Sequence, residues 1–205
     1  MIRVYSYPIS GHSHRVRLFL SLLGLPHEVV DVDVPGGEHK SPEFLARNPF
    51  GQIPVLEDDG VVLADSNAIL VYLALRYDGS GRWYPRDPAG AAAVQRWLSV
   101  AAGELHSGPG TARLAVLFNR PEMLDRAREI AARLFGILEG QLATRPFLTG
   151  DTPTIADIAL YTYTAHAPEG GMSLDPWPAL RAWLARIEAL PGFVPMPPSP
   201  VPRAH

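Results

Sequence analysis

The sequence predicts an α+β domain of element order βαβ-α-ββα over residues 1–77, followed by an all-α domain over residues 89–205. Short apolar runs rich in β-branched residues predict the strands of the first domain. Residues 78–88 are dense in glycine and proline, which predicts a linker. Beyond the linker, apolar residues recur at helical spacing and no run alternates as a strand does. We therefore expect two domains of different class.

The elements of the first domain follow from local signals. Gly24 followed by Pro26 ends the first helix, and the serine–proline pair at 41–42 starts the second. A strand, a helix and a parallel strand in succession require a right-handed crossover. The expected elements are a strand over residues 2–6, a loop over 8–14, a helix over 15–23, a strand over 28–34, a short helix over 42–46, strands over 53–57 and 61–64, and a helix over 66–77. This order is that of a thioredoxin-like domain.

The second domain is expected to contain only helices. Helical apolar spacing occurs over residues 89–105, 121–142, 154–163 and 179–190. Thr154 and Asp157 have the spacing of a capping box, with Asp in place of the usual Glu or Gln. Residues 193–202 contain five prolines, which predicts an irregular tail laid on the surface.

The composition is that of a folded protein. The 205 residues are 47% apolar and 19% charged, and the net charge of −3 gives no electrostatic basis for binding nucleic acid or anionic membrane. The absence of cysteine excludes disulfides, thiolate metal sites and any mechanism that uses a protein thiol as nucleophile. The N-terminus lacks the apolar core of a signal peptide, and no apolar run approaches the roughly 20 residues that span a bilayer. We expect a soluble, cytoplasmic protein.

Residues 51–69 combine a strand, a tight turn, a second strand and a helix start. Pro54 stands at the head of a strand, and a cis Ile53–Pro54 bond would turn the backbone groups of Ile53 into a cleft. Asp65 and Ser66 follow the second strand, where both residue types cap helix N-termini. Such a site suits a small peptide with an α-amino group and a carboxylate. Asp65 would bind the ammonium, while Ser66 and the helix amides would bind the carboxylate.

Gln52-Ile53-Pro54, followed by the run Asp-Ser-Asn-Ala-Ile at 65–69, resembles the glutathione-binding half of the cytosolic glutathione transferase superfamily. The similarity is to bacterial, serine-type members with zeta-, theta- and phi-like N-terminal motifs. It implies that Gln52, Ile53 and Pro54 bind the cysteinyl part of glutathione, and that Asp65 and Ser66 bind its γ-glutamyl end. The usual acid is Glu, and Asp65 is one methylene shorter. The resemblance covers nearly the whole chain and implies glutathione transferase architecture and a homodimer.

The loop before the first helix carries the candidate for activating the thiol of glutathione. The run Ser-Gly-His-Ser-His-Arg-Val at 10–16 is similar to the zeta-class pattern Ser-Ser-Cys-Ser-x-Arg-Val, which places the donor at Ser10. Ser13 aligns with a secondary serine, and His12 replaces a Cys or Asn, so both are alternates. A plain helix cap is the other role open to Ser10, since a cap and a thiol donor need similar geometry.

Two further interpretations of this loop are weaker. A tyrosine donor, Tyr5 or Tyr7, is typical of other classes of the superfamily. His12 and His14 suggest a metal, but residues two apart on a helix do not face each other and the sequence shows no third ligand nearby. We therefore expect no metal cofactor.

Glu38-His39-Lys40 precedes the short helix and resembles the loop that holds the glycyl carboxylate of glutathione in theta- and phi-like members. The resemblance implies that His39 and Lys40 bind this carboxylate through charge-assisted hydrogen bonds. Lys40 is the only lysine in the chain. A solvated polar loop is the alternative.

The second substrate of the family lies between the domains, against the first helix of the all-α domain. The resemblance implies that His106, Ser107, Thr111 and Leu114 line its pocket. An apolar stripe in this region is otherwise part of a core or a dimer interface.

The implied function is a glutathione transferase in detoxification, which activates the thiol of glutathione, its co-substrate, for attack on a small, largely apolar electrophile. Three alternative functions remain open: a non-catalytic glutathione- or ligand-binding protein, a glutathione-dependent isomerase, and a disulfide reductase that uses two glutathiones.

Overall fold

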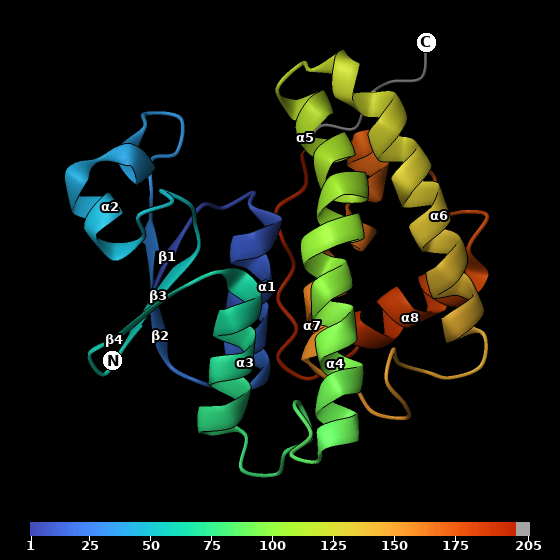
Figure 1. The fold of residues 1–205 in the computed structure, drawn as a ribbon, viewed down its shortest axis with the longest axis horizontal. Coiled ribbons are helices and arrows are strands. Elements are labelled where there is room, and N and C mark those ends of the chain that lie inside the picture. The colour runs from blue at the N-terminus through green and yellow to red at the C-terminus, as the bar shows by residue number, and fades with distance from the viewer. Residues whose placement is uncertain (200–205) are drawn as a thin grey trace.

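The computed structural model describes residues 1–199, so the last three residues of the predicted tail and the end of the predicted all-α domain lie outside the described residues. The first half, here called the sheet half, contains a four-stranded mixed sheet (Figure 1). Its elements are β1 (Ile2–Ser6), α1 (Gly11–Leu22), β2 (His27–Asp31), the 3₁₀ turn η1 (Glu38–Lys40), α2 (Pro42–Arg47), β3 (Val55–Asp58), β4 (Val61–Ala64) and α3 (Ser66–Tyr77).

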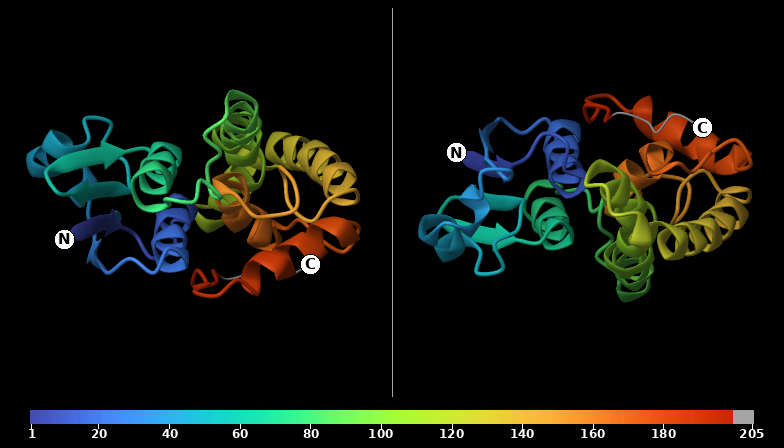
Figure 2. Two further views of the ribbon diagram at one scale, coloured as in Figure 1. Left: turned by 90° about the horizontal axis from the view of Figure 1, so that it is seen from below. Right: turned by 90° about the horizontal axis from the view of Figure 1, so that it is seen from above.

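The sheet has the strand order β2-β1-β3-β4. β1 pairs with β2 in parallel, while β3 pairs antiparallel with both β1 and β4. Helices α1 and α3 cover the face of the sheet that is turned toward the rest of the molecule, and α2 covers the other face (Figures 1 and 2). The predicted βαβ-α-ββα thioredoxin-like order is confirmed.

The helical half follows α3. It consists of α4 (Pro88–Val100), the π-helical segment η2 (Ala101–Gly110), α5 (Thr111–Leu117), the 3₁₀ turn η3 (Pro121–Met123), α6 (Leu124–Leu142), α7 (Ile155–Ala165), the 3₁₀ turn η4 (Ala167–Gly170) and α8 (Pro178–Glu188). One continuous apolar core joins the halves, since α1 packs on α7 and buried side chains of both halves touch within one cluster. The buried helix α7 therefore lies at the centre of the contact between the halves.

No helix within residues 1–199 has both the length and the apolar character needed to cross a membrane.

The helical half departs from the prediction after residue 105. The chain continues as η2 and α5 where the sequence predicts no element over residues 106–120. Pro109 lies inside this helical stretch and lacks the N–H that an α-helical bond requires. The wider π-helical turns accommodate it, and local propensity does not show this.

Several predicted boundaries also differ from the structure, two of them in the sheet half near the start of the chain. α1 begins at Gly11 and not at residue 15, because Ser10 caps it by accepting the N–H of Ser13. β2 spans 27–31 and not 28–34, since the chain turns after Val32. The described part of the tail contains no helix or strand, and its prolines Pro195, Pro197 and Pro198 are exposed, while Met196 and Ser199 are only 4% and 7% exposed.

Candidate functional site

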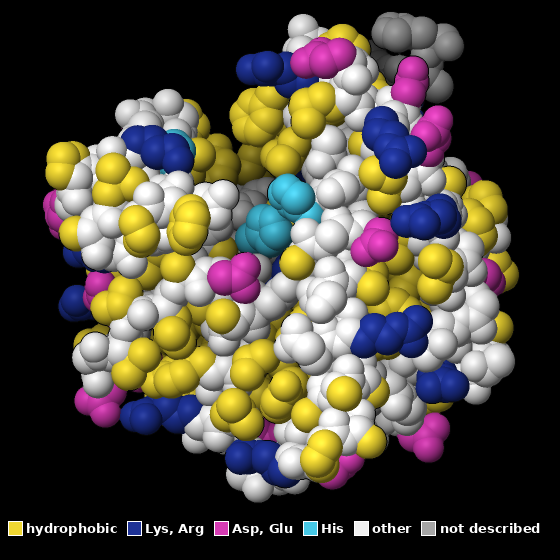
Figure 3. Space-filling model, viewed as in Figure 1, with side chains coloured by type: hydrophobic (Ala, Val, Ile, Leu, Met, Phe, Trp, Pro, Cys, Tyr) yellow, Lys and Arg dark blue, Asp and Glu magenta, His cyan; other side chains and the backbone are white. Residues whose placement is uncertain are grey.

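A cleft of about 550 Å³ lies between the two halves. One wall comes from the loops and helix starts of the sheet half, and the other from η2, α5 and α7. The space-filling view shows histidine side chains gathered in the hollow between the halves, with hydrophobic side chains above them (Figure 3). Every predicted glutathione contact lies on the first wall: His39, Lys40, Gln52, Ile53, Pro54, Asp65 and Ser66.

The segment before β3 forms the edge of the sheet-half wall. The Ile53–Pro54 peptide bond is cis, as the sequence predicts. Asn48 holds the segment by donating from Nδ2 to the carbonyl of Gln52 at 2.7 Å. Gly51 has φ +57°, and a Cβ there would lie 2.8 Å from the His39 carbonyl oxygen. Only glycine fits this close approach of two backbones without strain.

Asp65 is the N-cap of α3. Its Oδ1 accepts the N–H groups of Asn67 and Ala68, both at 2.9 Å. Its backbone has φ +70°, a left-handed conformation that costs a non-glycine residue of the order of 1–3 kcal/mol. Such strain is typical of functional sites, and the exposed Asp65 carboxylate lines the cleft beside the buried hydroxyl of Ser66.

Arg15 lies beneath this helix start and is fully buried. Its Nη1 donates to Ser66 Oγ at 3.2 Å and to Asn67 Oδ1 at 2.8 Å. Its Nε and Nη2 have no hydrogen-bond partner among the described residues. Burial lowers the pKa of Arg15 to about 10, so it stays charged at neutral pH. Sequence reasoning missed Arg15 and Asn67 as site residues, although both lie inside the motifs that carry the resemblance.

The three candidates for the thiol donor occupy different positions. Ser10 lines the cleft, and its Oγ accepts the Ser13 N–H at 3.2 Å, which leaves its own O–H free to donate. Ser13 is fully buried, and its Oγ accepts the Tyr7 N–H at 3.4 Å. Ser13 is not part of the cleft lining, because it lies on the inner face of α1.

His12 also lines the cleft and joins its two walls. Its Nδ1 lies 3.3 Å from Ser66 Oγ, and its Nε2 lies 3.4 Å from Nδ1 of His106. Burial, followed by the charge of Arg15, lowers the pKa of His12 well below its ordinary value. The imidazole is therefore neutral at neutral pH.

His39 and Lys40 border the cleft from η1. Lys40 Nζ donates to the carbonyls of Phe50 and Gly51 at 3.2 and 2.8 Å. His39 Nδ1 is buried and has no partner among residues 1–199. Lys40 thus ties η1 to the loop before β3 while its cationic group stays at the cleft.

The helical-half wall is only partly the one that the sequence predicts. His106 and Leu114 line the cleft, but Ser107 and Thr111 do not. Ser107 is exposed, and Thr111 donates its hydroxyl to the carbonyl of His106 at 2.9 Å. The π-helical winding of η2 changes which residues share a face, which α-helical spacing cannot anticipate.

Sequence reasoning missed most of this second wall: Ala102, Arg113, Leu117, Phe118 and Tyr163. Tyr163 on α7 is 3% exposed, and its ring packs against α1. A Cβ on Gly11 would lie 2.7 Å from that ring, so the glycine lets the start of α1 approach α7. No local pattern signals this contact, because its two members lie 152 positions apart in the sequence.

The two walls differ in chemistry. The sheet-half wall offers a carboxylate, hydroxyls, helix amides and cations, whereas Leu114, Leu117 and Phe118 make part of the opposite wall apolar. This arrangement can hold a small zwitterionic peptide beside an apolar molecule. Among residues 1–199, no three His, Cys, Asp or Glu side chains gather to hold a metal ion.

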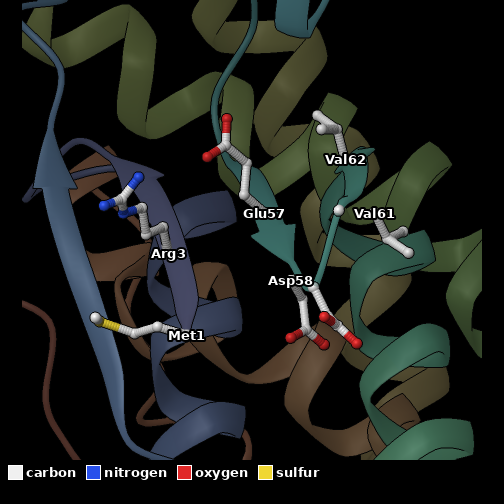
Figure 4. A pocket seen from close by; sticks show the side chains of 8 residues that line it. Met1, Arg3, Glu57, Asp58, Val61 and Val62 are labelled. Atoms are coloured by element: carbon white, nitrogen blue, oxygen red, sulfur yellow. The ribbon is translucent and has the colours of Figure 1, made fainter.

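A second hollow, of about 340 Å³, lies where the β3–β4 hairpin turns (Figure 4). Its charged side chains already have partners. Arg3 pairs with Glu28, and Glu57 pairs with Arg47. Asp58 accepts from two tyrosine hydroxyls of α3. With these groups engaged, the hollow offers little to a polar ligand.

Known proteins resemble this chain in both halves of the fold. Residues 9–76 match the family described as Glutathione S-transferase, N-terminal domain, and residues 94–191 match Glutathione S-transferase, C-terminal domain. Glutathione S-transferase 3 of Zea mays is 34% identical, over 97% of either chain. Glutathione S-transferase theta-2 of Homo sapiens is 33% identical, over 90% of this chain and 79% of that protein. The crystal structure of glutathione S-transferase from Pseudomonas fluorescens Pf-5 superposes with a TM-score of 0.89 at 38% identity, over 95% of this chain and 98% of the other.

Proposed function

The chain belongs to the glutathione S-transferase family and is a glutathione transferase, and on that premise we propose that Ser10 activates the thiol of bound glutathione for attack on a small, largely apolar electrophile. The observation that carries this proposal is the position of Ser10. Its hydroxyl lines the cleft at the N-terminus of α1, with its oxygen already accepting a backbone N–H.

Glutathione occupies the sheet-half wall in this proposal. The Asp65 carboxylate binds the α-ammonium group, while the Ser66 hydroxyl and the amides of α3 bind the adjacent carboxylate. The buried charge of Arg15, 3.2 Å from Ser66 Oγ, adds to the attraction. The Ile53 backbone, between Gln52 and Pro54, pairs with the cysteinyl residue.

The glycyl carboxylate lies against His39 and Lys40. Lys40 Nζ has three hydrogens, of which the carbonyls of Phe50 and Gly51 take two. The third is available for a carboxylate, so Lys40 serves as both a structural tie and a ligand-binding cation.

Thiol activation follows from hydrogen bonding and charge. A free thiol has a pKa of about 8.5, and lowering it by one or two units multiplies the thiolate fraction at neutral pH about tenfold or more. The Ser10 O–H donates to the sulfur, and the N-terminal end of α1 adds a partial positive charge. His12 is neutral and therefore adds none.

The electrophile lies against the apolar part of the opposite wall, formed by Leu114, Leu117 and Phe118. Holding it there beside a preformed thiolate removes the entropic cost of bringing the two reactants together. The three relatives named above are all glutathione S-transferases, and their names do not favour the alternative functions, namely a non-catalytic binding protein, an isomerase or a disulfide reductase.

We also propose a homodimer that acts in cytoplasmic detoxification. Phe50 is 77% exposed beside the cleft rim, and a second copy of the chain would cover this large apolar side chain. Light scattering on the purified protein tests the dimer, and a monomeric mass would overturn it.

The decisive experiment is an ultraviolet difference titration of glutathione on the protein across pH. In the parent, the bound thiol should ionise at least about one pH unit below free glutathione. The Ser10→Ala variant should lose this shift and about tenfold or more in kcat, with glutathione affinity within about twofold.

Ser13→Ala is the matched control, since Ser13 does not line the cleft. It should leave the ionisation of the bound thiol unchanged. Equal ionisation in Ser10→Ala and parent would instead assign the donor to His12 or a tyrosine.

A further inference from the structure

A buried cation, Arg113, lies directly behind the loop that carries Ser10. It belongs to α5, is 1% exposed and lines the floor of the cleft. Its Nη1 donates to the carbonyl of Ile9 at 2.8 Å. Because Ile9 precedes Ser10, this bond acts on the peptide unit that leads into the proposed thiol donor.

The orientation of Arg113 is set by two further segments. Its Nε donates to Glu169 Oε2 at 2.5 Å, and its Nη2 donates to Ser199 Oγ at 2.7 Å. A guanidinium is planar and rigid, so fixing two of its nitrogens also fixes the third, which holds Ile9.

Glu169 is itself held in place. It is 4% exposed, and its Oε1 accepts from the Ser199 N–H at 3.0 Å and from His166 Nδ1 at 2.6 Å. Gly170 lets the η4 turn reach α5, because a Cβ there would lie 2.9 Å from the Arg113 backbone nitrogen. The position of Arg113 thus depends on a close packing of η4 on α5.

The C-terminal segment reaches this cluster after crossing α1. Ser21 donates its hydroxyl to the Gly192 carbonyl at 2.7 Å, and His14 Nε2 lies 2.8 Å from the Val194 carbonyl oxygen. Figure 1 shows this segment running beside α1 toward the end of the molecule where α5 lies. Residues 192–199 therefore connect the C-terminal end of α1 to Arg113 at the cleft.

The loop before α1 has three consecutive carbonyls with different partners. The Tyr7 carbonyl accepts from the Ser10 N–H at 3.0 Å, and the Pro8 carbonyl accepts from Arg17 Nη2 at 3.0 Å. Both partners belong to the sheet half. The Ile9 carbonyl is held from the helical half by Arg113.

We propose that Arg113 is a positioning residue for thiol activation, and that Glu169 and Ser199 act through it. This proposal rests on the proposed role of Ser10. By holding the Ile9 carbonyl, Arg113 sets where the Ser10 hydroxyl lies relative to the sulfur. A displacement of a catalytic group by about 1 Å can cost up to about 100-fold in rate. The helical half and the C-terminal segment thereby take part in activating a substrate bound to the sheet half.

The test is the variant Arg113→Lys. Lysine keeps a positive charge beside the buried Glu169, so no carboxylate is left unpaired, but it lacks the rigid fork. We expect kcat to fall about tenfold with the glutathione KM within about twofold. The pKa of the bound thiol should rise by about half a unit to one unit toward that of free glutathione.

Ser199→Ala is a second, milder variant, which removes one of the two bonds that orient Arg113. It should change kcat and the thiol ionisation in the same direction, with kcat falling about two- to threefold. If Arg113→Lys is not folded by circular dichroism, Ser199→Ala decides alone.

Arg128→Lys is the matched control. Arg128 donates to the carbonyl of Gly170 at 3.2 Å, so it touches the same η4 turn, but its side chain is exposed and does not contact Ile9. It should behave as the parent. A general loosening of η4 would affect both lysine variants alike, and that result would overturn the proposal.

Two failures are distinguishable. If Ser10→Ala raises the pKa of the bound thiol while Arg113→Lys and Ser199→Ala leave it and kcat unchanged, Arg113 has no positioning role. If the parent itself shows no lowered thiol pKa, or Ser10→Ala does not alter it, the proposed function of Ser10 fails, and the positioning role fails with it.

Discussion

The two walls of the cleft are built in different ways. On the sheet-half wall, residues that lie together are neighbours in the sequence, as at the helix start of Asp65 and Ser66. On the helical-half wall, Arg113 and Tyr163 come from α5 and α7, and the residues behind them, Glu169 and Ser199, come from two further segments. The first wall is a set of local motifs, whereas the second exists only through long-range packing.

The charges of the two walls are also used differently. Asp65 is exposed, and Lys40 keeps one hydrogen free, so both are available to a ligand. Arg113 and Glu169 are buried and joined to each other. A charge that needs water or a ligand lies at the surface, whereas a buried charge must be satisfied by the protein. In the proposed complex, the exposed charges of the sheet-half wall bind glutathione, whereas the buried Arg113–Glu169 pair holds the loop before α1 in place.

The largest expected effect is a loss of stability in a variant of the helical half, and it tests whether the two halves have separate roles. Asp157 is fully buried, and its carboxylate accepts from the Leu148 N–H, the Thr154 N–H and the Trp183 indole N–H at 2.9 to 3.0 Å. The Asp157→Ala change leaves these donors unpaired and should lower the free energy of unfolding by about 4 kcal/mol. Urea denaturation measures it.

Asp125→Ala, in the exposed first turn of α6, is the control and should cost no more than about 0.5 kcal/mol. Glutathione affinity per folded molecule should be unchanged in Asp157→Ala. A parallel loss of affinity would show that the two walls are not energetically separate.

The next effect concerns the contact between the halves. His14 on α1 is 1% exposed, between Thr162 of α7 and the carbonyl of Val194. Burial lowers its pKa to about 4, although the bond to Val194 opposes the shift; the nearby charges of Arg17, His166 and Arg15 contribute to it. The unfolded chain thus binds a proton at this residue below its ordinary pKa of about 6.5, while the folded protein does not.

The direction in which stability changes with pH follows from this difference in proton binding. Stability is full above pH ~6.5 and falls as the pH drops toward about 4, by about 3 kcal/mol for His14 alone. Denaturation at several pH values checks it, against His14→Asn. The variant should show a flatter decline, after subtraction of its own constant loss. Parallel curves for variant and parent would contradict the assignment.

The difference between the walls also explains what the sequence can and cannot predict. Gln52 to Pro54 and Asp65–Ser66 need special backbone geometry, and proline, glycine and capping residues record that need in the sequence. The strands and most helices likewise follow from apolar spacing. Pro109 misleads, because the π-helical segment accommodates a proline that an α-helix would reject.

No local sequence signal predicts that the side chains of the helical-half wall lie at the cleft. Tyr163 looks like any core tyrosine of a buried helix, and Arg113 looks like any polar residue of an amphipathic one. Their positions depend on Gly11 and Gly170, which permit close approaches between segments far apart in the sequence. The resemblance to the family predicts Ser107 and Thr111 at the pocket together with His106, but neither of the two lines the cleft.

The smallest effect tests the sheet-half wall with a single atom exchanged. Asn caps helices as well as Asp does and tolerates left-handed backbone, so Asp65→Asn should keep the bonds to Asn67 and Ala68. It removes only the negative charge proposed to bind the ammonium of glutathione. We expect about tenfold weaker glutathione binding, or about 1.4 kcal/mol, by calorimetry, with the pKa of the bound thiol and the stability unchanged.

Asp87→Asn is the matched control, because Asp87 caps α4 by accepting the Gly90 N–H at 2.8 Å and lies outside the cleft. It should bind glutathione like the parent. If both variants bind equally well, Asp65 is a helix cap alone, and its strained backbone serves the fold and not the ligand. If only Asp65→Asn is weakened, the strain at φ +70° holds a carboxylate where a substrate ammonium needs it, and the sheet-half wall binds through charge that local sequence records.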